Sequence, residues 1–193
     1  MRSFTLARLA RIGVLALAVC FVVHASLTTG QQKVNMIERD RWPSHGPIAF
    51  TPRELLALGM SEIDSAAPGA VVNPTLRLEP GGATATALID FDLLKGLGHG
   101  GEANGNWLFS RLVSGRQPVT VSVAITSGRG KMTVHPTAVS VSGYSISGGA
   151  LNFIVQNFLV TQYPQAVVDK PFALPPNVAR VELNTKSALV YRR

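Results

Sequence analysis

The chain has 193 residues, of which 46% are hydrophobic and only 15% are charged. This length fits one domain, and about 70% of the unfolded surface is buried on folding at this size. The net charge of +7 includes three arginines in the first 25 residues; beyond residue 25, 15 Lys and Arg stand against 11 Asp and Glu, scattered along the sequence. The sequence has no basic cluster with interleaved aromatic residues, so we expect no nucleic-acid partner. The small positive charge is compatible with a mild attraction to anionic lipid headgroups.

Residues 1–25 predict a signal peptide or a signal anchor. Three arginines precede an apolar run of 12 residues, Ile12 to Val23, and Val23-His24-Ala25 fits a cleavage site before Ser26. Because a spanning helix needs about 20 apolar residues, both cleavage and retention as a membrane tether over residues 12–28 stay open. Either outcome predicts an exported protein, periplasmic or otherwise outside the cytoplasmic membrane.

Residues 26–48 are polar and mixed in charge, and they end in Trp-Pro-Ser-His-Gly-Pro. We interpret them as a linker, with His45 in a solvated loop, and we expect a single domain over residues 49–193. The only cysteine, Cys20, lies in the export segment. The domain therefore has no disulfide, thiol nucleophile or cysteine metal site.

The domain begins with a strong helix signal. Thr51 suits the N-cap, Pro52 the first helical position, and Glu54 the third, where its side chain can complete a capping box. A helix from Pro52 to about Asp64 is predicted.

Two strands follow, Val71–Leu78 and Ala83–Phe91, joined by a Pro-Gly turn. Alanine occupies alternate positions of the second strand, at Ala83, Ala85 and Ala87. A face of such small residues leaves room for either a neighbouring helix or a ligand.

Asp90 and Asp92 end this strand two residues apart, so both would face the same way. Paired carboxylates can do acid–base work or bind a metal ion. The alternative, which we prefer, is that Asp92 caps the turn at Leu93-Leu94 and Asp90 is solvated. The glycine-rich stretch from Gly96 to Asn106 lacks the glycine spacing and Lys-Ser/Thr of a phosphate-binding loop.

Residues 117–126 give the cleanest strand pattern. One face carries Val119, Val121, Val123 and Ile125. In the next strand the apolar positions shift from even to odd numbers after Val134, which predicts a bulge near Pro136-Thr137. Residues 178–183 and 188–191 predict a closing hairpin.

The stretch from Met132 to Val168 contains no Asp, Glu, Lys or Arg. Its second half, Gly149 to Tyr163, predicts a helix with Phe153 and Val160 opposite the main apolar stripe. That stripe consists of Leu151, Ile154, Val155, Phe158 and Leu159. Two interpretations stay open: a core helix on a sheet with neutral amides in water, or a helix with an apolar ligand beside it.

Several phrases together resemble a family. They are Phe50 to Leu56, Leu76 to Gly81 leading to Ile89-Asp90-Phe91, the strand pair around Gly128-Arg129-Gly130, the apolar helix, and Pro171 to Pro175 before a closing strand pair. Their order over residues 50–193 resembles the small exported or membrane-tethered lipid binders of the LmeA-like and YpmS-like type, related to the tubular lipid-binding (TULIP) fold. The resemblance implies an α+β domain in which a curved antiparallel sheet packs against two or three helices, with a lipid tail between them.

These observations predict an envelope-associated protein that binds or carries a lipid or another apolar ligand at the membrane surface. The predicted apolar lining is Val121, Leu151, Ile154, Val155, Phe158 and Leu159, and each CH₂ group buried there contributes about 0.8 kcal/mol. The alternative is a structural or adaptor domain that binds a protein partner or forms a homodimer through Phe153 and Val160. We predict no enzyme, cofactor or metal site, because the sequence has neither Gly-x-Ser-x-Gly nor His-Glu-x-x-His.

Overall fold

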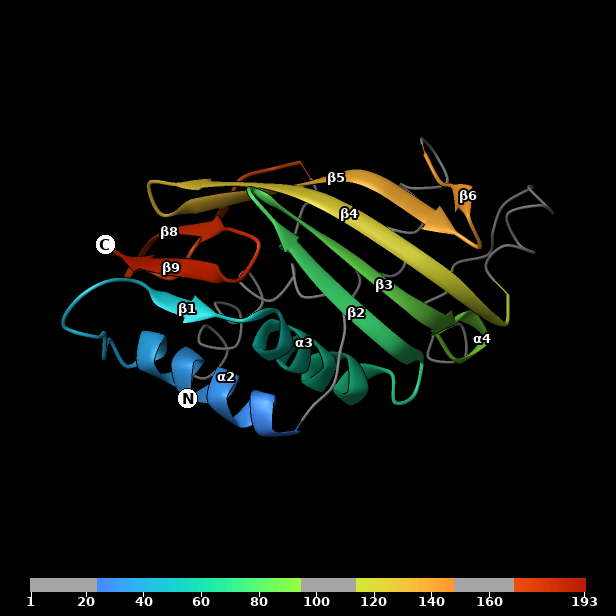
Figure 1. Ribbon diagram of the computed structural model, residues 1–193, viewed down its shortest axis with the longest axis horizontal. Helices are drawn as coiled ribbons and strands as arrows, with labels where there is room; N and C mark the ends of the chain where they lie inside the picture. Colours follow the sequence, from blue (N-terminus) through green and yellow to red (C-terminus); the bar gives the residue numbers. More distant parts are fainter. Residues whose placement is uncertain (1–23, 95–113, 148–168) are drawn as a thin grey trace, which may run out of the picture.

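A long, curved antiparallel sheet dominates the computed structural model, which describes residues 24–94, 114–147 and 169–193. Three helices and a smaller sheet accompany it in this part of the chain (Figure 1). The elements are α2 (His24–Glu38), β1 (Ile48–Phe50), α3 (Pro52–Ala66), β2 (Val71–Glu79), β3 (Gly82–Asp90), α4 (Phe91–Leu94), β4 (Arg116–Gly128), β5 (Lys131–Val141), β6 (Tyr144–Ser145), β7 (Phe172–Ala173), β8 (Val178–Leu183) and β9 (Ala188–Arg192). The predicted α+β class, with a curved antiparallel sheet packed against helices, is confirmed.

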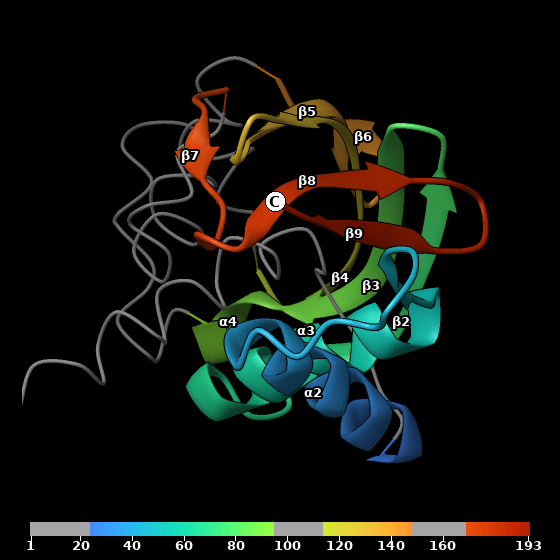
Figure 2. The same cartoon turned by 90° about the vertical axis from the view of Figure 1, so that its left-hand side faces the viewer.

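The large sheet has the strand order β2-β3-β4-β5-β6, and β7 also pairs with β5. Ser122 pairs with Ala138 and Val123 with Pro136, so Thr137 is an extra residue in β5. This is the bulge that the change of apolar phase predicted. A second register shift lies in β2, between Val72 and Thr75. Because bulges bend a strand and increase its twist, they fit the curl of the sheet seen in Figure 2.

Strand alternation gives the sheet two chemically different faces. One face is lined by small and apolar side chains: Leu76, Leu78, Ala83, Ala85, Ala87, Val119, Val121, Val123, Val139 and Val141. We call it the inner face, because the helices and the smaller sheet pack against it. The outer face carries hydroxyl groups, among them the pairs Thr75–Thr86 at 2.6 Å and Thr84–Ser122 at 2.9 Å between oxygens.

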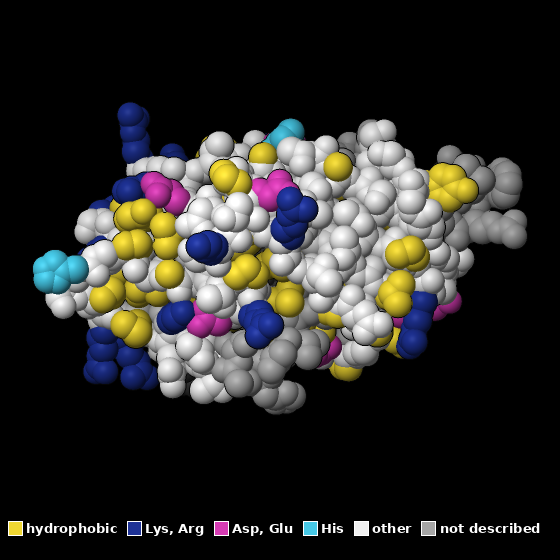
Figure 3. Space-filling model, in the orientation of Figure 1, with side chains coloured by type: hydrophobic (Ala, Val, Ile, Leu, Met, Phe, Trp, Pro, Cys, Tyr) yellow, Lys and Arg dark blue, Asp and Glu magenta, His cyan; other side chains and the backbone are white. Residues whose placement is uncertain are grey.

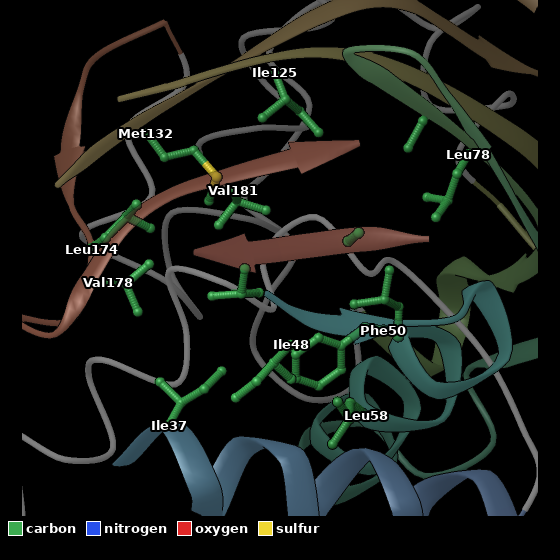
Figure 4. Close-up of a cluster of buried hydrophobic side chains, with 14 residues drawn as sticks. Ile37, Ile48, Phe50, Leu58, Leu78, Ile125, Met132, Leu174, Val178 and Val181 are labelled. Carbon is green, nitrogen blue, oxygen red and sulfur yellow. The ribbon is translucent and has the colours of Figure 1, made fainter. Parts of the chain in front are cut away.

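The smaller sheet, with the order β1-β9-β8, closes one end of the large sheet. Backbone hydrogen bonds join the two sheets: Gly81 N donates to Leu183 O at 3.2 Å, and Gly130 N donates to Ala179 O at 2.7 Å. We call this the closed end. The main core lies here, and Phe50, Met132, Val178 and Val190 are at most 1% exposed (Figure 4).

Helix α3 starts as its sequence predicts. Glu54 N donates to Thr51 Oγ1 at 3.3 Å, and Thr51 N donates to Glu54 Oε2 at 2.8 Å, which completes the capping box. Its first half places Leu55 and Leu58 in the main core, and its second half packs Met60 in a cluster that includes Val71 of β2. The helix thus covers the inner face beside β2.

The predicted linker over residues 26–48 is corrected by the structure. Residues His24–Glu38 form α2, which packs against α3 so closely that a Cβ on Gly30 would lie 3.1 Å from the Leu58 side chain. Ile37 is only 6% exposed and belongs to the main core. Leu27, Val34 and Ile37 lie on one helical stripe, a signal that the surrounding glutamines and other polar residues obscure.

Among the helices that the structure describes, none has both the length and the apolar character needed to cross a membrane. Residues 1–23, which hold most of the predicted export segment, lie outside the described residues.

Candidate functional site

The centre of the inner face is a row of apolar side chains across four strands. Val121 of β4 pairs with Ala85 of β3 and Val139 of β5, and Ala85 pairs in turn with Leu76 of β2. Paired residues in antiparallel strands project to the same side of the sheet. The row therefore presents a continuous hydrocarbon surface.

Burial divides this surface into a packed margin and a less covered centre. Val139 and Val141 are buried in a cluster with Phe91 and Ile146, whereas Val119 and Val121 are half-buried at its edge. These two valines keep apolar area that the described side chains cover only in part. We call the surface of Ala85, Val119, Val121 and their neighbour Val123 the apolar face.

The alanines of β3 serve two purposes in the structure. Ala83 is buried in the main core, and Ala87 packs against the cluster formed by α3 and β2. The small side chains thus make room for a neighbouring helix, one of the two alternatives the pattern left open. Ala85 lies between them, beside Val121, and is 8% exposed.

A group of polar residues marks the end of the sheet where β3 stops and β4 starts. Arg116 Nε lies 3.1 Å from Asp90 Oδ2, and the Ser142 hydroxyl donates to Gln117 Oε1. We call this group, with Asp92, the polar rim. It lies at the end of the sheet opposite the closed end, which we call the far end (Figure 1).

The preferred roles for the two aspartates were wrong. Asp90, not Asp92, caps the short helix α4: Leu93 N donates to Asp90 Oδ1 at 3.1 Å. This backbone bond is the main cause that lowers the pKa of Asp90, and Arg116 lowers it further. Asp92 accepts a bond from Gly115 N at 3.0 Å. Both carboxylates thus accept backbone hydrogen bonds at the polar rim.

Two large apolar side chains are exposed at the far end. Leu93 of α4 is 44% exposed and Tyr144 of β6 is 66% exposed. Tyr144 pairs with the buried Val141 at the end of β5. The part of an apolar ligand that extended from the apolar face toward this end would contact these hydrocarbon and aromatic side chains before it reached water.

Of the predicted lining residues, the structure places Val121 as expected, on the inner face and facing apolar neighbours. Leu151, Ile154, Val155, Phe158 and Leu159 lie outside the described residues, as do Phe153 and Val160. Their contact with Val121 stays a prediction.

No cluster of three or more His, Cys, Asp or Glu residues in the described ranges could hold a metal ion. His45 is exposed, and His135 Nδ1 is hydrogen-bonded to Asp169 Oδ1, with side-chain exposures of 62% and 56% for the two residues. His135 pairs with Ala124, which projects to the outer face, away from Val121.

Sequence reasoning missed one feature that the fold assembles. Three pairs of exposed basic residues that lie far apart in the sequence meet at the closed end: Arg39 and Arg41, Arg129 and Lys131, and Arg192 and Arg193. Their spacing along the chain carries no signal, because only the strand topology brings them together.

Comparison of this chain with protein-family models, with curated proteins and with solved structures found no match.

Proposed function

We propose that the protein is exported to the cell envelope and binds or carries a lipid or another apolar ligand on the inner face of its sheet. The observation that carries this proposal is the apolar face itself, which has no charged side chain and whose valines Val119, Val121 and Val123 are half-buried. Covering apolar surface contributes roughly 25 cal/mol per Å², so an acyl chain laid on these valines would bind without polar contacts. The polar rim is placed to meet a headgroup at the far end.

The uncharged segment 132–168 supports the same proposal from the sequence. Its predicted helix would supply the second wall of the site, so that the ligand lies between helix and sheet. A charge-free helix with apolar residues on two sides is costly to expose to water, which favours an apolar neighbour on each side.

The alternative function, an adaptor that binds a protein partner, is poorly supported by the edge strand β2. Strand addition by a partner needs a regular free edge, but a register shift between Val72 and Thr75 interrupts β2. Pro74 lacks a backbone donor and Asn73 has a φ of +49° at this point. These are devices by which proteins prevent edge pairing.

The direct test is extraction of lipid from the purified protein followed by mass spectrometry. We expect a lipid or another hydrophobic molecule to co-purify at up to one copy per chain. A protein that carries none, and that takes up no acyl chain from added vesicles, would contradict the proposal.

A pair of variants separates a ligand site from an ordinary core. Val121→Phe adds volume at the half-buried position, and we expect it to lower the bound lipid with little change in the free energy of unfolding. Val141→Phe is the matched control, because Val141 is fully buried on the same face and overpacking there costs about 1–3 kcal/mol. Equal destabilisation by both substitutions would identify the apolar face as plain core.

Export and tethering are tested by the mass of the chain recovered from the envelope of its host. We expect the protein outside the cytoplasmic membrane. A mass that starts at Ser26 indicates cleavage, and an intact mass in the membrane fraction indicates a tether. Recovery of the intact chain from the cytoplasm would contradict export.

A further inference from the structure

Exposed basic side chains gather at the closed end of the molecule. They come from the segment after α2, from the turn between β4 and β5, and from the end of β9. The six residues are Arg39, Arg41, Arg129, Lys131, Arg192 and Arg193, and all are exposed. We call them the basic end, and Figure 3 shows Lys and Arg side chains clustered at the left-hand side of the molecule.

Specific contacts hold these three segments together. Arg192 Nη2 lies 2.9 Å from Asp40 Oδ2, which joins the end of β9 to the segment after α2. The Arg193 guanidinium lies against the β4–β5 turn, where a Cβ on Gly130 would be 3.1 Å from Arg193 Cζ. The basic end is therefore a single surface on the folded domain.

The positive charge of the described residues is concentrated there. Glu38 and Asp40 are the acidic residues of the segments that form the basic end, so six cations face two carboxylates. Elsewhere in the described ranges, seven Lys and Arg stand against eight Asp and Glu. The excess charge is thus a local property of this end and not a general property of the domain.

The aromatic residues near this end do not form a platform for nucleic-acid bases. Trp42 and Phe172 are partly buried against the main core, and Tyr191 stacks with Arg180, whose Cζ lies 3.8 Å from the ring centroid. Single-stranded nucleic acids need free aromatic faces for stacking. Exposed guanidinium and ammonium groups on turns and a chain end instead suit a flat layer of phosphates.

We propose that the basic end docks on anionic phospholipid headgroups at a membrane surface. Each Lys or Arg close to such a surface strengthens binding by about fivefold. The inference rests on charge and goes beyond the apolar site: it holds whether or not the apolar face carries a lipid tail.

The test is protection of lysines from acetylation, read by mass spectrometry on the full chain. The protein is mixed with vesicles of phosphatidylcholine alone or with an equal part of phosphatidylglycerol. We expect Lys131 to react several times more slowly on the anionic vesicles, while Lys186 in the β8–β9 turn, also exposed, reacts at the same rate on both. High salt should remove the protection, because ions screen exposed charges.

Two double variants give a matched comparison. Arg41→Gln with Arg129→Asn should raise the anionic lipid concentration needed for half-protection of Lys131 by about 25-fold. Asparagine is chosen because Arg129 has a φ of +52° and asparagine tolerates this conformation. The control, Arg53→Gln with Arg77→Gln, removes two exposed charges elsewhere and should bind like the unmodified protein.

Three results would overturn the proposal. Equal acetylation of Lys131 on both kinds of vesicle is one, and equal weakening by the two double variants is another. The third is protection of Lys131 by DNA or by an acidic polysaccharide but not by anionic vesicles, which would assign the basic end to that polymer. Loss of lipid from the apolar face, by contrast, affects only the proposed function.

Discussion

The two ends of the large sheet share the same strands but differ in how their inner faces are covered. At the closed end, the smaller sheet and two helices bury Phe50, Met132 and Val178 to 1% exposure or less. At the far end, Leu93 is 44% and Tyr144 66% exposed. The closed end is packed as expected of a stable core, whereas the far end combines a small buried cluster around Val141 with exposed apolar side chains.

This difference suggests that one part of the sheet stabilises the fold and another part holds a ligand. The closed end supplies much of the free energy of folding, so the centre of the inner face is free to keep half-buried valines for a ligand. If so, substitutions in the two parts should differ in size and in what they change. Four experiments test this, from the largest expected effect to the smallest.

Phe50→Ala should be the most damaging change. Phe50 is 1% exposed at the centre of the main core, and truncation of a buried phenylalanine costs about 3–5 kcal/mol through lost transfer energy and the cavity that remains. Unfolding in urea measures the loss directly. Val121→Ala is the counterpart in the apolar face and should cost about 1 kcal/mol, because its side chain is half-buried. Similar losses of unfolding free energy for the two variants would contradict the proposed difference between the two regions.

Lys33→Met should remove about 2 kcal/mol from the free energy of unfolding. Lys33 Nζ lies 2.7 Å from Glu54 Oε1, and without it the carboxylate of Glu54, 5% exposed, loses its charge partner. A fully buried pair would lose about 3–5 kcal/mol, but the Lys33 side chain is 26% exposed, so water screens part of the effect. The control is Lys33→Met combined with Glu54→Gln, which should lose less than the sum of the single variants. Strict additivity would show that the pair does not couple α2 to α3.

The free energy of unfolding should also fall in acid, because Glu54 at the closed end becomes protonated. Burial raises the pKa of this carboxyl, but hydrogen bonds from Lys33 and Thr51 outweigh it, so the folded-state pKa lies below its ordinary value of 4.5. The contribution is therefore complete above about pH 4.5 and is lost as the pH falls through the lower folded-state value. Urea unfolding at a series of pH values gives the free energy of unfolding as a function of pH. Its slope against pH should be smaller for Glu54→Gln than for the unmodified protein. An unchanged slope would assign the acid sensitivity to other carboxylates, such as Asp90.

Much of the fold could be predicted, because its signals are local. The capping box at Thr51 and Glu54 fixed the start of α3, and the change of apolar phase located the bulge at Thr137. The pairing of Ile48 with Val190 joins strands 142 positions apart, and β1 has only three residues, too few to show alternation. The hairpin of β8 and β9 was predicted, but no local pattern indicates its pairing with β1, so the complete smaller sheet and the closed end were not foreseen.

In the candidate site, the position of Val121 on the sheet was predictable from the sequence. Alternation placed Val121 on an apolar face, and its pairing with Ala85 and Val139 agrees with that. The capping role of Asp90 was missed because α4 starts at Phe91, two residues earlier than expected, and Arg116 approaches from a strand that sequence spacing could not identify. Position in space, which decides which charges meet, is the information that a single sequence lacks.

Tyr144→Ser at the far end should have the smallest effect on stability. The ring is 66% exposed in the two-residue strand β6, and substitutions at such positions change the free energy of unfolding by about 0.5 kcal/mol or less. Because tyrosine combines an apolar ring with a polar hydroxyl, it suits the boundary between a lipid tail and water. We therefore expect the variant to unfold at the same urea concentration and to release its lipid to acceptor vesicles faster. A loss above about 1 kcal/mol would mean that Tyr144 is packed like the residues of the closed end, and its ring would then not be available to contact a ligand.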